Sequence, residues 1–159
     1  MSRLYNISEV VWLIPEKLAK SNVPDYSDLL VWQVKGINSI VNLLEEKYQE
    51  VAQDEINVGF NVLHSPIPDF YAPSLDQLKK IVNWIDSEIS AGRKVLVHCF
   101  AGIGRTATVL IAYLIYKRRD ITSAKDQVFK TGAAPQSIEQ QKILEEYYQY
   151  IKELRNLVE

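Results

Sequence analysis

A strand, a glycine-containing loop and a helix follow one another in the second half of the chain, and this unit constrains the fold most. Residues 94–98 are a short, mostly aliphatic run of the kind found in central parallel strands. Residues 105–119 are apolar nearly all round, which indicates a helix buried at the centre of a domain. A buried strand leading directly into a buried helix needs other strands and helices to cover both, so the unit predicts an α/β fold.

The rest of the chain supplies those elements in alternation. In chain order, we expect a hairpin from residues 10–14 and 17–20, a helix over 25–35, a strand over 37–44, a solvated helix or loop over 45–55, a strand over 58–67, a helix from 75 to the stop at 92, and helices over 122–130 and 137–158. Ser74 and Gln77 form a capping-box pattern at the start of one helix. Residues 1–159 are therefore predicted to form a single α/β domain, with a central, mostly parallel sheet of about four to five strands flanked by helices.

Length and composition agree with one ordinary globular domain. The chain has 159 residues, within the roughly 100 to 200 residues of a typical domain. Hydrophobic residues at 47% and charged residues at 24% exclude a disordered chain. Eighteen basic against twenty acidic side chains give a net charge of −2, which argues against a general affinity for nucleic acid or a membrane surface. Any anion-binding site must therefore be local.

Cysteine and histidine usage limits the possible sites further. The single cysteine, Cys99, excludes an intrachain disulfide framework and a cysteine-rich zinc site. His64 and His98 offer no metal-ligand spacing with it, so we expect neither a metal nor a cofactor. Residues 1–10 hold no apolar run of signal-peptide length, and the apolar stretch 107–116 covers about half of the roughly 20 residues that a membrane span needs. We expect a cytoplasmic monomer.

The loop between the buried strand and the buried helix has the composition of an anion-binding cup. Its glycines free the backbone to curl so that successive N–H groups point inward, and the positive end of the next helix adds to their field. The planar guanidinium of Arg105 can hold two oxygens of a tetrahedral anion. The residues predicted to bind phosphate are Phe100, Ala101, Gly102, Ile103, Gly104 and Arg105.

The same field favours the thiolate form of Cys99, which stands at the base of the cup. Thr106 can donate a hydroxyl hydrogen bond to the sulfur, and His98 is expected to support the loop by hydrogen-bonding carbonyls beneath it. A thiolate under a bound phosphoryl group is a nucleophile for covalent phosphoryl transfer. The alternative is that Cys99 is a small buried thiol beside a core histidine.

A proline-rich segment, residues 65–73, contains the candidate acid. Asp69 follows a predicted parallel strand, at the edge of the sheet where ligands of open α/β folds bind. It could protonate a leaving oxygen and later deprotonate water, or it could be an ordinary turn aspartate. Phe70 and Tyr71 flank it as possible pocket walls, while His64 is predicted to be a core histidine.

These residues resemble the cysteine-dependent protein phosphatases. His98 and Cys99, then five residues, then Arg105 and Thr106 match the signature loop, and residues 67–70 match the general-acid loop. The chain is most similar to a small atypical dual-specificity phosphatase, with a weaker likeness from residue 11 to the last helix. The resemblance implies that Cys99 is the nucleophile, Asp69 the general acid and base, Arg105 the phosphate clamp and Thr106 the partner of the sulfur.

The start of the last predicted helix matches the family less closely. Residues 136–140 are similar to a family segment whose glutamine positions the hydrolytic water, which implies that role for Gln140. Ser137 and Gln140 also fit a capping box, in which the glutamine reaches back to the helix start. The family often has glycine where this chain has Ala107, and Arg-Pro-Gly where it has residues 131–133.

The resemblance implies hydrolysis of phosphoprotein monoesters, with phosphotyrosine favoured and phosphoserine and phosphothreonine possible. The expected partners are phosphorylated proteins or peptides, with no nucleic acid and no membrane. A phosphoinositide or RNA 5′-phosphatase is the first alternative, but it would want basic residues in the loop, and Phe100, Ala101 and Ile103 supply none. The second is a phosphopeptide-binding module, which would be expected to lack the nucleophile or the acid.

Overall fold

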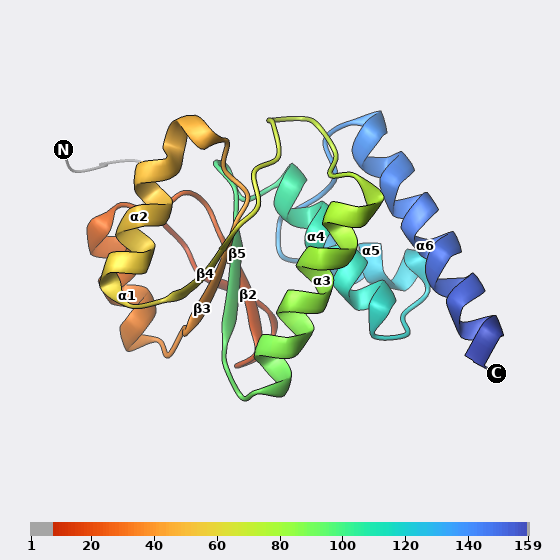
Figure 1. Ribbon diagram of the computed structural model, residues 1–159, viewed down its shortest axis with the longest axis horizontal. Coiled ribbons are helices and arrows are strands. Elements are labelled where there is room, and N and C mark those ends of the chain that lie inside the picture. Colours follow the sequence, from red (N-terminus) through yellow and green to blue (C-terminus); the bar gives the residue numbers. More distant parts are fainter. Residues whose placement is uncertain (1–7, 159) are drawn as a thin grey trace.

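The computed structural model describes residues 8–158, so both ends of the predicted domain and most of the segment inspected for a signal peptide lie outside the described residues. Helices cover both faces of a five-stranded sheet (Figure 1). The strands are β1 (Val11–Ile14), β2 (Leu18–Ser21), β3 (Ser39–Asn42), β4 (Asn61–His64) and β5 (Val95–His98). The helices are α1 (Tyr26–Val34), the 3₁₀ turn η1 (Glu46–Tyr48), α2 (Gln49–Val58), α3 (Leu75–Ser90), α4 (Gly104–Tyr116), α5 (Ile121–Phe129) and α6 (Ile138–Val158).

The strand order places β5 at the centre of the sheet. The order is β1-β2-β5-β3-β4, with β1 antiparallel to β2 and every other pair parallel, as the sequence predicts. His98, the last residue of β5, pairs with Ser21 on one side and Asn42 on the other. The carboxyl ends of three parallel strands therefore meet at one edge, which is where ligands bind in open α/β sheets.

The predicted hairpin forms at the start of the chain. Lys17 N donates to Ile14 O at 3.0 Å across the turn. Pro15 occupies the first central position of that turn, where its fixed φ is favourable, and Glu16 takes the second with φ +63°. The hairpin brings β2 alongside β5 and so beneath the loop that follows β5.

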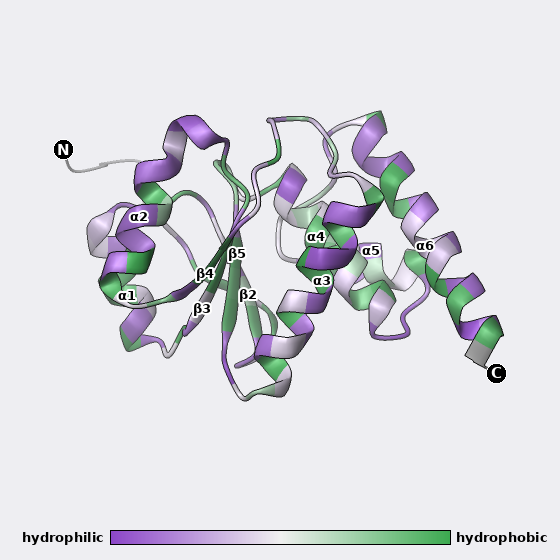
Figure 2. Ribbon diagram, viewed as in Figure 1, coloured by the Kyte–Doolittle hydropathy of each residue, from purple (hydrophilic) through white to green (hydrophobic). Residues whose placement is uncertain are grey.

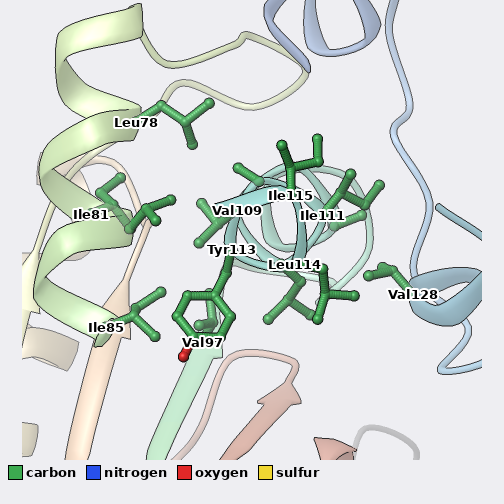
Figure 3. Close-up of a cluster of buried hydrophobic side chains, with 14 of the residues drawn as sticks. Leu78, Ile81, Ile85, Val97, Val109, Ile111, Tyr113, Leu114, Ile115 and Val128 are labelled. Carbon is green, nitrogen blue, oxygen red and sulfur yellow. The ribbon is translucent and has the colours of Figure 1, made fainter. Parts of the chain in front are cut away.

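The larger core lies between the sheet and helices α3 to α6. Every residue of α4 from Gly104 to Ile115 is buried, which confirms the prediction of a central helix. Leu78, Ile81 and Ile85 of α3 pack toward α4 from one side, and Val128 of α5 from another (Figure 3). The other face of the sheet is covered by α1, whose Trp32 is buried against it. Figure 2 shows the matching distribution of apolar residues, concentrated in the strands and in α4.

The strand predicted over residues 58–67 is shorter than expected. Val58 is the last residue of α2, Gly59 ends that helix with φ +114°, and β4 covers only Asn61–His64. An apolar run does not distinguish a helix end from a strand start, whereas the left-handed glycine between them does. The residues after β4 form the proline-rich loop that was predicted.

Most of the segment 45–55 is exposed or half-buried, as its acidic sequence suggests, but Ala52 and Glu55 are buried. It forms η1 and most of α2, and Glu55 is completely buried.

The prediction that all three tryptophans are core residues is only partly right, because Trp12 and Trp84 are half-buried and only Trp32 is fully enclosed. Tyr113 is buried as expected. None of the described helices is both long and apolar enough to span a membrane.

Candidate active site

The loop that joins β5 to α4 lies at the carboxyl edge of the sheet and packs against β2. Gly102 adopts φ +74°, and a Cβ at this position would lie 2.6 Å from Ser21 O. Only glycine satisfies both the left-handed conformation and this close approach. The loop therefore takes its curled shape partly from direct contact with the end of β2.

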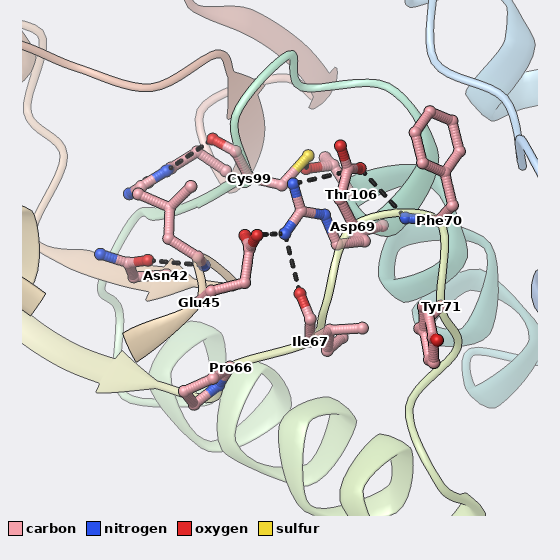
Figure 4. A network of polar contacts seen from close by, with 12 residues as sticks. Asn42, Glu45, Pro66, Ile67, Asp69, Phe70, Tyr71, Cys99 and Thr106 are labelled. Atoms are coloured by element: carbon pink, nitrogen blue, oxygen red, sulfur yellow. Dashed lines mark hydrogen bonds and ion pairs between the residues drawn. The ribbon is translucent and has the colours of Figure 1, made fainter. Parts of the chain in front are cut away.

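Cys99 lies at the base of the loop with its sulfur beside Thr106 (Figure 4). Only 2% of the residue is exposed, and Thr106 Oγ1 donates a hydrogen bond to Sγ at 3.1 Å. The predicted contact between these two side chains is therefore present. A hydroxyl donor stabilises a thiolate, and the buried position limits which reagents reach the sulfur.

Arg105 connects three separate segments of the chain (Figure 4). Its Nη1 donates to Glu45 Oε1 at 2.6 Å and to Ile67 O at 2.8 Å. Its Nη2 lies 3.4 Å from Asp69 Oδ1. The guanidinium is almost fully buried, so these contacts hold its plane in one orientation within the site.

Glu45 is a site residue that the sequence did not reveal. Partial burial by itself would raise the pKa of this carboxyl, but the hydrogen bond from Arg105 and the charge of Arg105 outweigh it, so the pKa is lowered. The acidic surroundings of Glu45 suggested a solvated surface. Its position, three residues after β3 at the carboxyl edge of the sheet, is the signal that could have identified it.

The proline-rich segment, residues 65–73, carries Asp69 to the edge of the signature loop and is called the acid loop below. The Asp69 side chain is 52% exposed, in contrast to Cys99 and Arg105. Its Oδ1 also accepts a hydrogen bond from Phe70 N at 3.0 Å, and Phe70 adopts φ +65°. Asp69 therefore forms part of a local turn and lies beside Arg105. The turn interpretation is confirmed by this local contact, and the role of Asp69 as an acid stays a prediction.

Gln77 anchors the beginning of the acid loop. Its Nε2 donates to Ser65 Oγ at 2.9 Å and to Pro66 O at 3.0 Å. Ser74 caps α3 by accepting from Gln77 N, as predicted. The other half of the predicted capping box is wrong, because the Gln77 side chain reaches the acid loop instead of the start of its own helix.

Gln140 anchors the other end of the acid loop. It is fully buried, its Nε2 donates to Tyr71 O at 3.1 Å, and its Oε1 accepts from Gln136 N at 2.7 Å. Gln140 N donates to Ser137 Oγ, so half of the predicted capping box forms here as well. Both the nitrogen and the oxygen of the Gln140 side-chain amide are thus hydrogen-bonded to backbone groups.

Gln136 was not singled out from the sequence. Its exposed side chain lies against the end of the signature loop, where a Cβ at Gly104 would be 2.6 Å from Gln136 Oε1. A free carboxamide next to the loop is able to hydrogen-bond water or substrate. The family resemblance includes residue 136 in its matched segment but assigns the glutamine role to Gln140, because the sequence does not show which of the two side chains is exposed beside the loop.

A buried polar network supports the signature loop from the side of α2. His98 Nδ1 lies 3.1 Å from Cys99 O, and His98 Nε2 lies 2.6 Å from Glu55 Oε2. The other oxygen of Glu55 accepts from Asn42 Nδ2 at 2.9 Å. The expected supporting role of His98 therefore fits its contacts, but one of its two partners is a carboxylate that the sequence analysis assigned to a solvated segment.

His64 is not the core histidine that was predicted. It is half-buried, and its Nε2 lies 2.8 Å from Leu44 O at the edge of the sheet. Within residues 8–158, no three histidine, cysteine, aspartate or glutamate side chains are grouped so as to hold a metal ion.

Both loops of the site carry exposed aromatic side chains. Phe100 belongs to the signature loop, and Phe70 and Tyr71 belong to the acid loop. Tyr48, at the end of η1, lies against Phe100 with ring centroids 5.7 Å apart. Large apolar surfaces that remain exposed beside a polar site are typical of ligand-binding edges.

A sequence model of the family described as "Polymorphic toxin system, DSP-PTPase phosphatase" matches residues 16–119. The chain belongs to this family. The matched region includes the acid loop, β5, the signature loop and α4, so the resemblance to the cysteine-dependent phosphatases is confirmed. The description of this family names a phosphatase.

Individual phosphatases show the same relationship. The chain is 29% identical over 119 residues to phosphatidylglycerophosphate phosphatase PTPMT2 of Arabidopsis thaliana, a match that covers 72% of this chain and 52% of that protein. It is 38% identical over 84 residues to putative tyrosine phosphatase 123R of Invertebrate iridescent virus 6, covering 53% and 54%. The DSP-PTPase chain described here thus spans about half the length of these curated relatives.

Solved structures match over nearly the whole chain. The crystal structure of Tk-PTP in the active form superposes with a TM-score of 0.82 at 32% identity, covering 88% of this chain and 96% of that one. The structure of PTPMT1 in complex with PI(5)P has a TM-score of 0.81 at 19% identity and shares the fold. The α/β fold of this DSP-PTPase is therefore that of known phosphatases.

Proposed function

We propose that this phosphatase hydrolyses phosphoprotein monoesters, phosphotyrosine above all, through a cysteinyl-phosphate intermediate. The observation that carries the proposal is the convergence of three groups on one loop. Thr106 holds the Cys99 sulfur at 3.1 Å, and Arg105 lies between that loop and Asp69, 3.4 Å from its carboxylate. A nucleophile, an anion clamp and an acid in one place are the components of covalent phosphoryl transfer.

In the first step, the Cys99 thiolate attacks phosphorus, and the bond between phosphorus and the ester oxygen breaks. Asp69 gives its proton to that leaving oxygen, so the product alcohol departs neutral. The amides of the signature loop and the Arg105 guanidinium hold the three remaining oxygens while charge moves among them. The products of this step are the alcohol, the Cys99 phosphothioester and the Asp69 carboxylate.

In the second step, water attacks the phosphothioester, and Asp69 takes its proton. Inorganic phosphate and the Cys99 thiolate are released, and both catalytic groups return to their starting states. Gln140 is a poor candidate for holding this water, because both atoms of its amide are bonded to backbone groups. Gln136 is the better candidate, since the carboxamides of both glutamines lie against Gly104 but only Gln136 is exposed.

The aromatic rim supports phosphotyrosine as the substrate class. Phe100, Phe70 and Tyr71 offer flat surfaces for a phenyl ring whose phosphate lies in the cup. The variable residues of the signature loop add no positive charge that would favour a polyanionic headgroup. The proposed substrates are phosphorylated proteins or peptides. The proposed location is the cytoplasm, and the proposed oligomeric state is a monomer.

Turnover of matched substrates tests this proposal. We expect kcat/KM for a phosphotyrosyl peptide to exceed those for the same peptide with phosphoserine or phosphothreonine by at least about tenfold, because the shorter side chains do not reach between the aromatic groups. Phosphatidylglycerophosphate and PI(5)P in detergent micelles are the comparison set, chosen because relatives are named for or crystallised with them. The Cys99→Ser variant controls for contaminating phosphatases.

Each alternative has its own signature in this experiment. A higher kcat/KM for either lipid would replace the proposed substrate class and leave the chemistry intact. Phosphopeptide binding without release of phosphate would favour a binding module. Turnover that survives in Cys99→Ser would contradict the nucleophile itself.

A further inference from the structure

Lys20 reaches the signature loop from behind, although it belongs to neither catalytic loop. It is the third residue of β2, pairs with Val97 of β5, and is only 9% exposed. Its Nζ donates to Gly102 O at 3.1 Å. A lysine at a nearly buried position in an interior strand is unusual, because lysine is almost never buried without a partner.

The contact with Gly102 O fixes the orientation of one peptide group in the loop. In a trans peptide the carbonyl and the following N–H point in opposite directions. Since Gly102 O is directed at Lys20, the N–H of Ile103 is directed away from it. Lys20 therefore helps to set the direction of an amide in the segment that is proposed to surround the phosphate.

Lys20 also interacts electrostatically with Cys99. Burial lowers the pKa of Lys20, although the charges of Cys99 and then Glu9 oppose this shift. The hollow behind the loop contains Glu9, Asn22, Phe100, Ala101 and Thr131 beside Lys20. Among its described residues, Glu9 and Lys20 are therefore the groups whose charge can vary with pH.

Among the described residues beside the loop, Arg105 and His98 have carboxylate partners of their own. Arg105 is bonded to Glu45 and Asp69, and His98 to Glu55 on the opposite face of β5. A lysine whose pKa is lowered by burial costs stability when it is charged, so packing alone does not explain its presence. A positive charge facing a thiolate does explain it.

We propose that Lys20 is a positioning residue for the phosphatase reaction, holding the signature loop through Gly102 O and stabilising the thiolate of Cys99. The inference rests on the proposed function, in which that thiolate is the nucleophile. The proposal adds a side chain from β2 to the site. The other proposed site side chains come from the segments that follow β3, β4 and β5.

The rate of Cys99 alkylation by iodoacetamide, measured against pH without phosphate, tests this directly. Only the thiolate reacts, and the chain has one cysteine, so the midpoint of the profile reports the ionisation of Cys99. Lys20→Met should move the midpoint upward by about 1 pH unit, since a unit positive charge near the sulfur is lost. Lys20→Arg, which keeps the charge, should recover most of the shift. Lys17→Met removes an exposed lysine from the same hairpin and should leave the midpoint unchanged.

A measurement with an unaltered Lys20 covers the case in which Lys20→Met fails to fold. The coupling between two titrating groups is reciprocal, so removing the thiolate must ease the loss of the Lys20 proton. The NMR titration of the Lys20 ¹³Cε resonance, assigned by its absence in Lys20→Arg, should shift to lower pH in Cys99→Ser than in the native chain.

The outcomes separate the inference from the function on which it rests. Native Cys99 that resists alkylation below the ordinary thiol range would contradict the nucleophile, whatever Lys20 does. Native Cys99 that reacts there, together with a folded Lys20→Met variant of unchanged profile, would overturn the role of Lys20 alone. The role of Lys20 would also be overturned if its ¹³Cε titration showed a neutral amine at pH 7, or if the titration midpoint were the same in Cys99→Ser as in the native chain.

Discussion

The signature loop and the acid loop meet at Arg105 but are built in opposite ways. The base of the signature loop, with Cys99 and Gly102, is buried. Groups from β2, β5 and α2 hold it from below: Ser21 O packs against Gly102, and His98 bonds both Cys99 O and Glu55. The acid loop runs over the surface, where Asp69 is half-exposed. It is attached near its ends, by Gln77 at Pro66 and by Gln140 at Tyr71.

This difference corresponds to what each loop must do in the proposed reaction. The cup has to present its amides and thiolate in one geometry throughout both steps, and a buried, hydrogen-bonded loop does so without reorganisation. The acid has to admit a substrate, donate a proton and then accept one, which suits a segment that is fixed near its ends and exposed around Asp69. Substitutions in the cup should therefore lower kcat for all substrates, whereas the loss of kcat caused by substitutions in the acid loop should depend on the leaving group.

Arg105→Lys should produce the largest loss of activity, because Arg105 is part of the signature loop motif and also bonds the acid loop. Lysine keeps the charge but loses the planar fork that bonds Glu45, Ile67 O and the phosphoryl oxygens. We expect kcat to fall by about 10³-fold or more with every substrate. Steady-state kinetics on an aryl phosphate and a phosphotyrosyl peptide measure this, and near-normal turnover of either would show that charge alone suffices.

Asp69→Asn should produce the next largest loss and should reveal the asymmetry between the loops. With a phosphotyrosyl peptide, we expect kcat to fall by roughly 10²- to 10⁴-fold, because no proton reaches the leaving oxygen. Release of the first equivalent of alcohol from an activated aryl phosphate should be much less sensitive, since that alcohol leaves without a proton. Equal losses for both substrates in this first turnover would place Asp69 in the cup rather than in acid catalysis.

Gln140→Leu should loosen the acid loop and leave the cup intact. The variant loses the hydrogen bonds to Tyr71 O and Gln136 N, about 1 kcal/mol each, so we expect kcat on a phosphotyrosyl peptide to fall by about 10-fold. The pH profile of Cys99 alkylation should not change. Gln141→Leu, one residue further along and exposed, is the matched control. A changed alkylation profile would mean that Gln140 supports the signature loop instead.

Glu45→Gln should have the smallest effect, and the effect should depend on pH. The pKa of Glu45 is lowered in the folded protein, so its ion pair with Arg105 adds stability above the pKa of the unfolded state. That stability is lost as pH falls through the lower, folded value. The native protein should therefore have the higher Tm at pH 7. The difference should shrink as pH falls below the ordinary carboxyl range, and it should disappear below the folded pKa, where both chains carry a neutral side chain. A difference that persists there would show that shape rather than charge is responsible.

The sequence predicted the fold and the three central residues because their signals are local. The Gly-rich loop between an apolar strand and an apolar helix identifies Cys99 and Arg105, and the prolines around Asp69 identify the acid loop. These segments carry their own physical signature, whichever elements pack beside them.

The residues that were missed act across the fold. Glu55 reaches His98 over 43 positions of sequence, and Arg105 reaches Glu45 over 60. In the sequence both glutamates belong to an acidic stretch that is indistinguishable from a solvated helix. The burial of Glu55 follows from the packing of α2 beside the sheet, and the contact of Glu45 with Arg105 follows from its place after β3. The contact of Lys20 with Gly102 follows from the pairing of β2 with β5. Pairings of this kind are set by tertiary structure, which no single segment encodes.

Trapping the intermediate tests the central claim most directly. In Asp69→Asn, an activated aryl phosphate should still phosphorylate Cys99, but breakdown should be slow because the general base is missing. Rapid acid quenching and mass spectrometry should then find one phosphoryl group per chain, on the peptide that contains Cys99, together with a matching burst of released alcohol. Continued turnover with no adduct on Cys99, or with an adduct on another residue, would contradict the account.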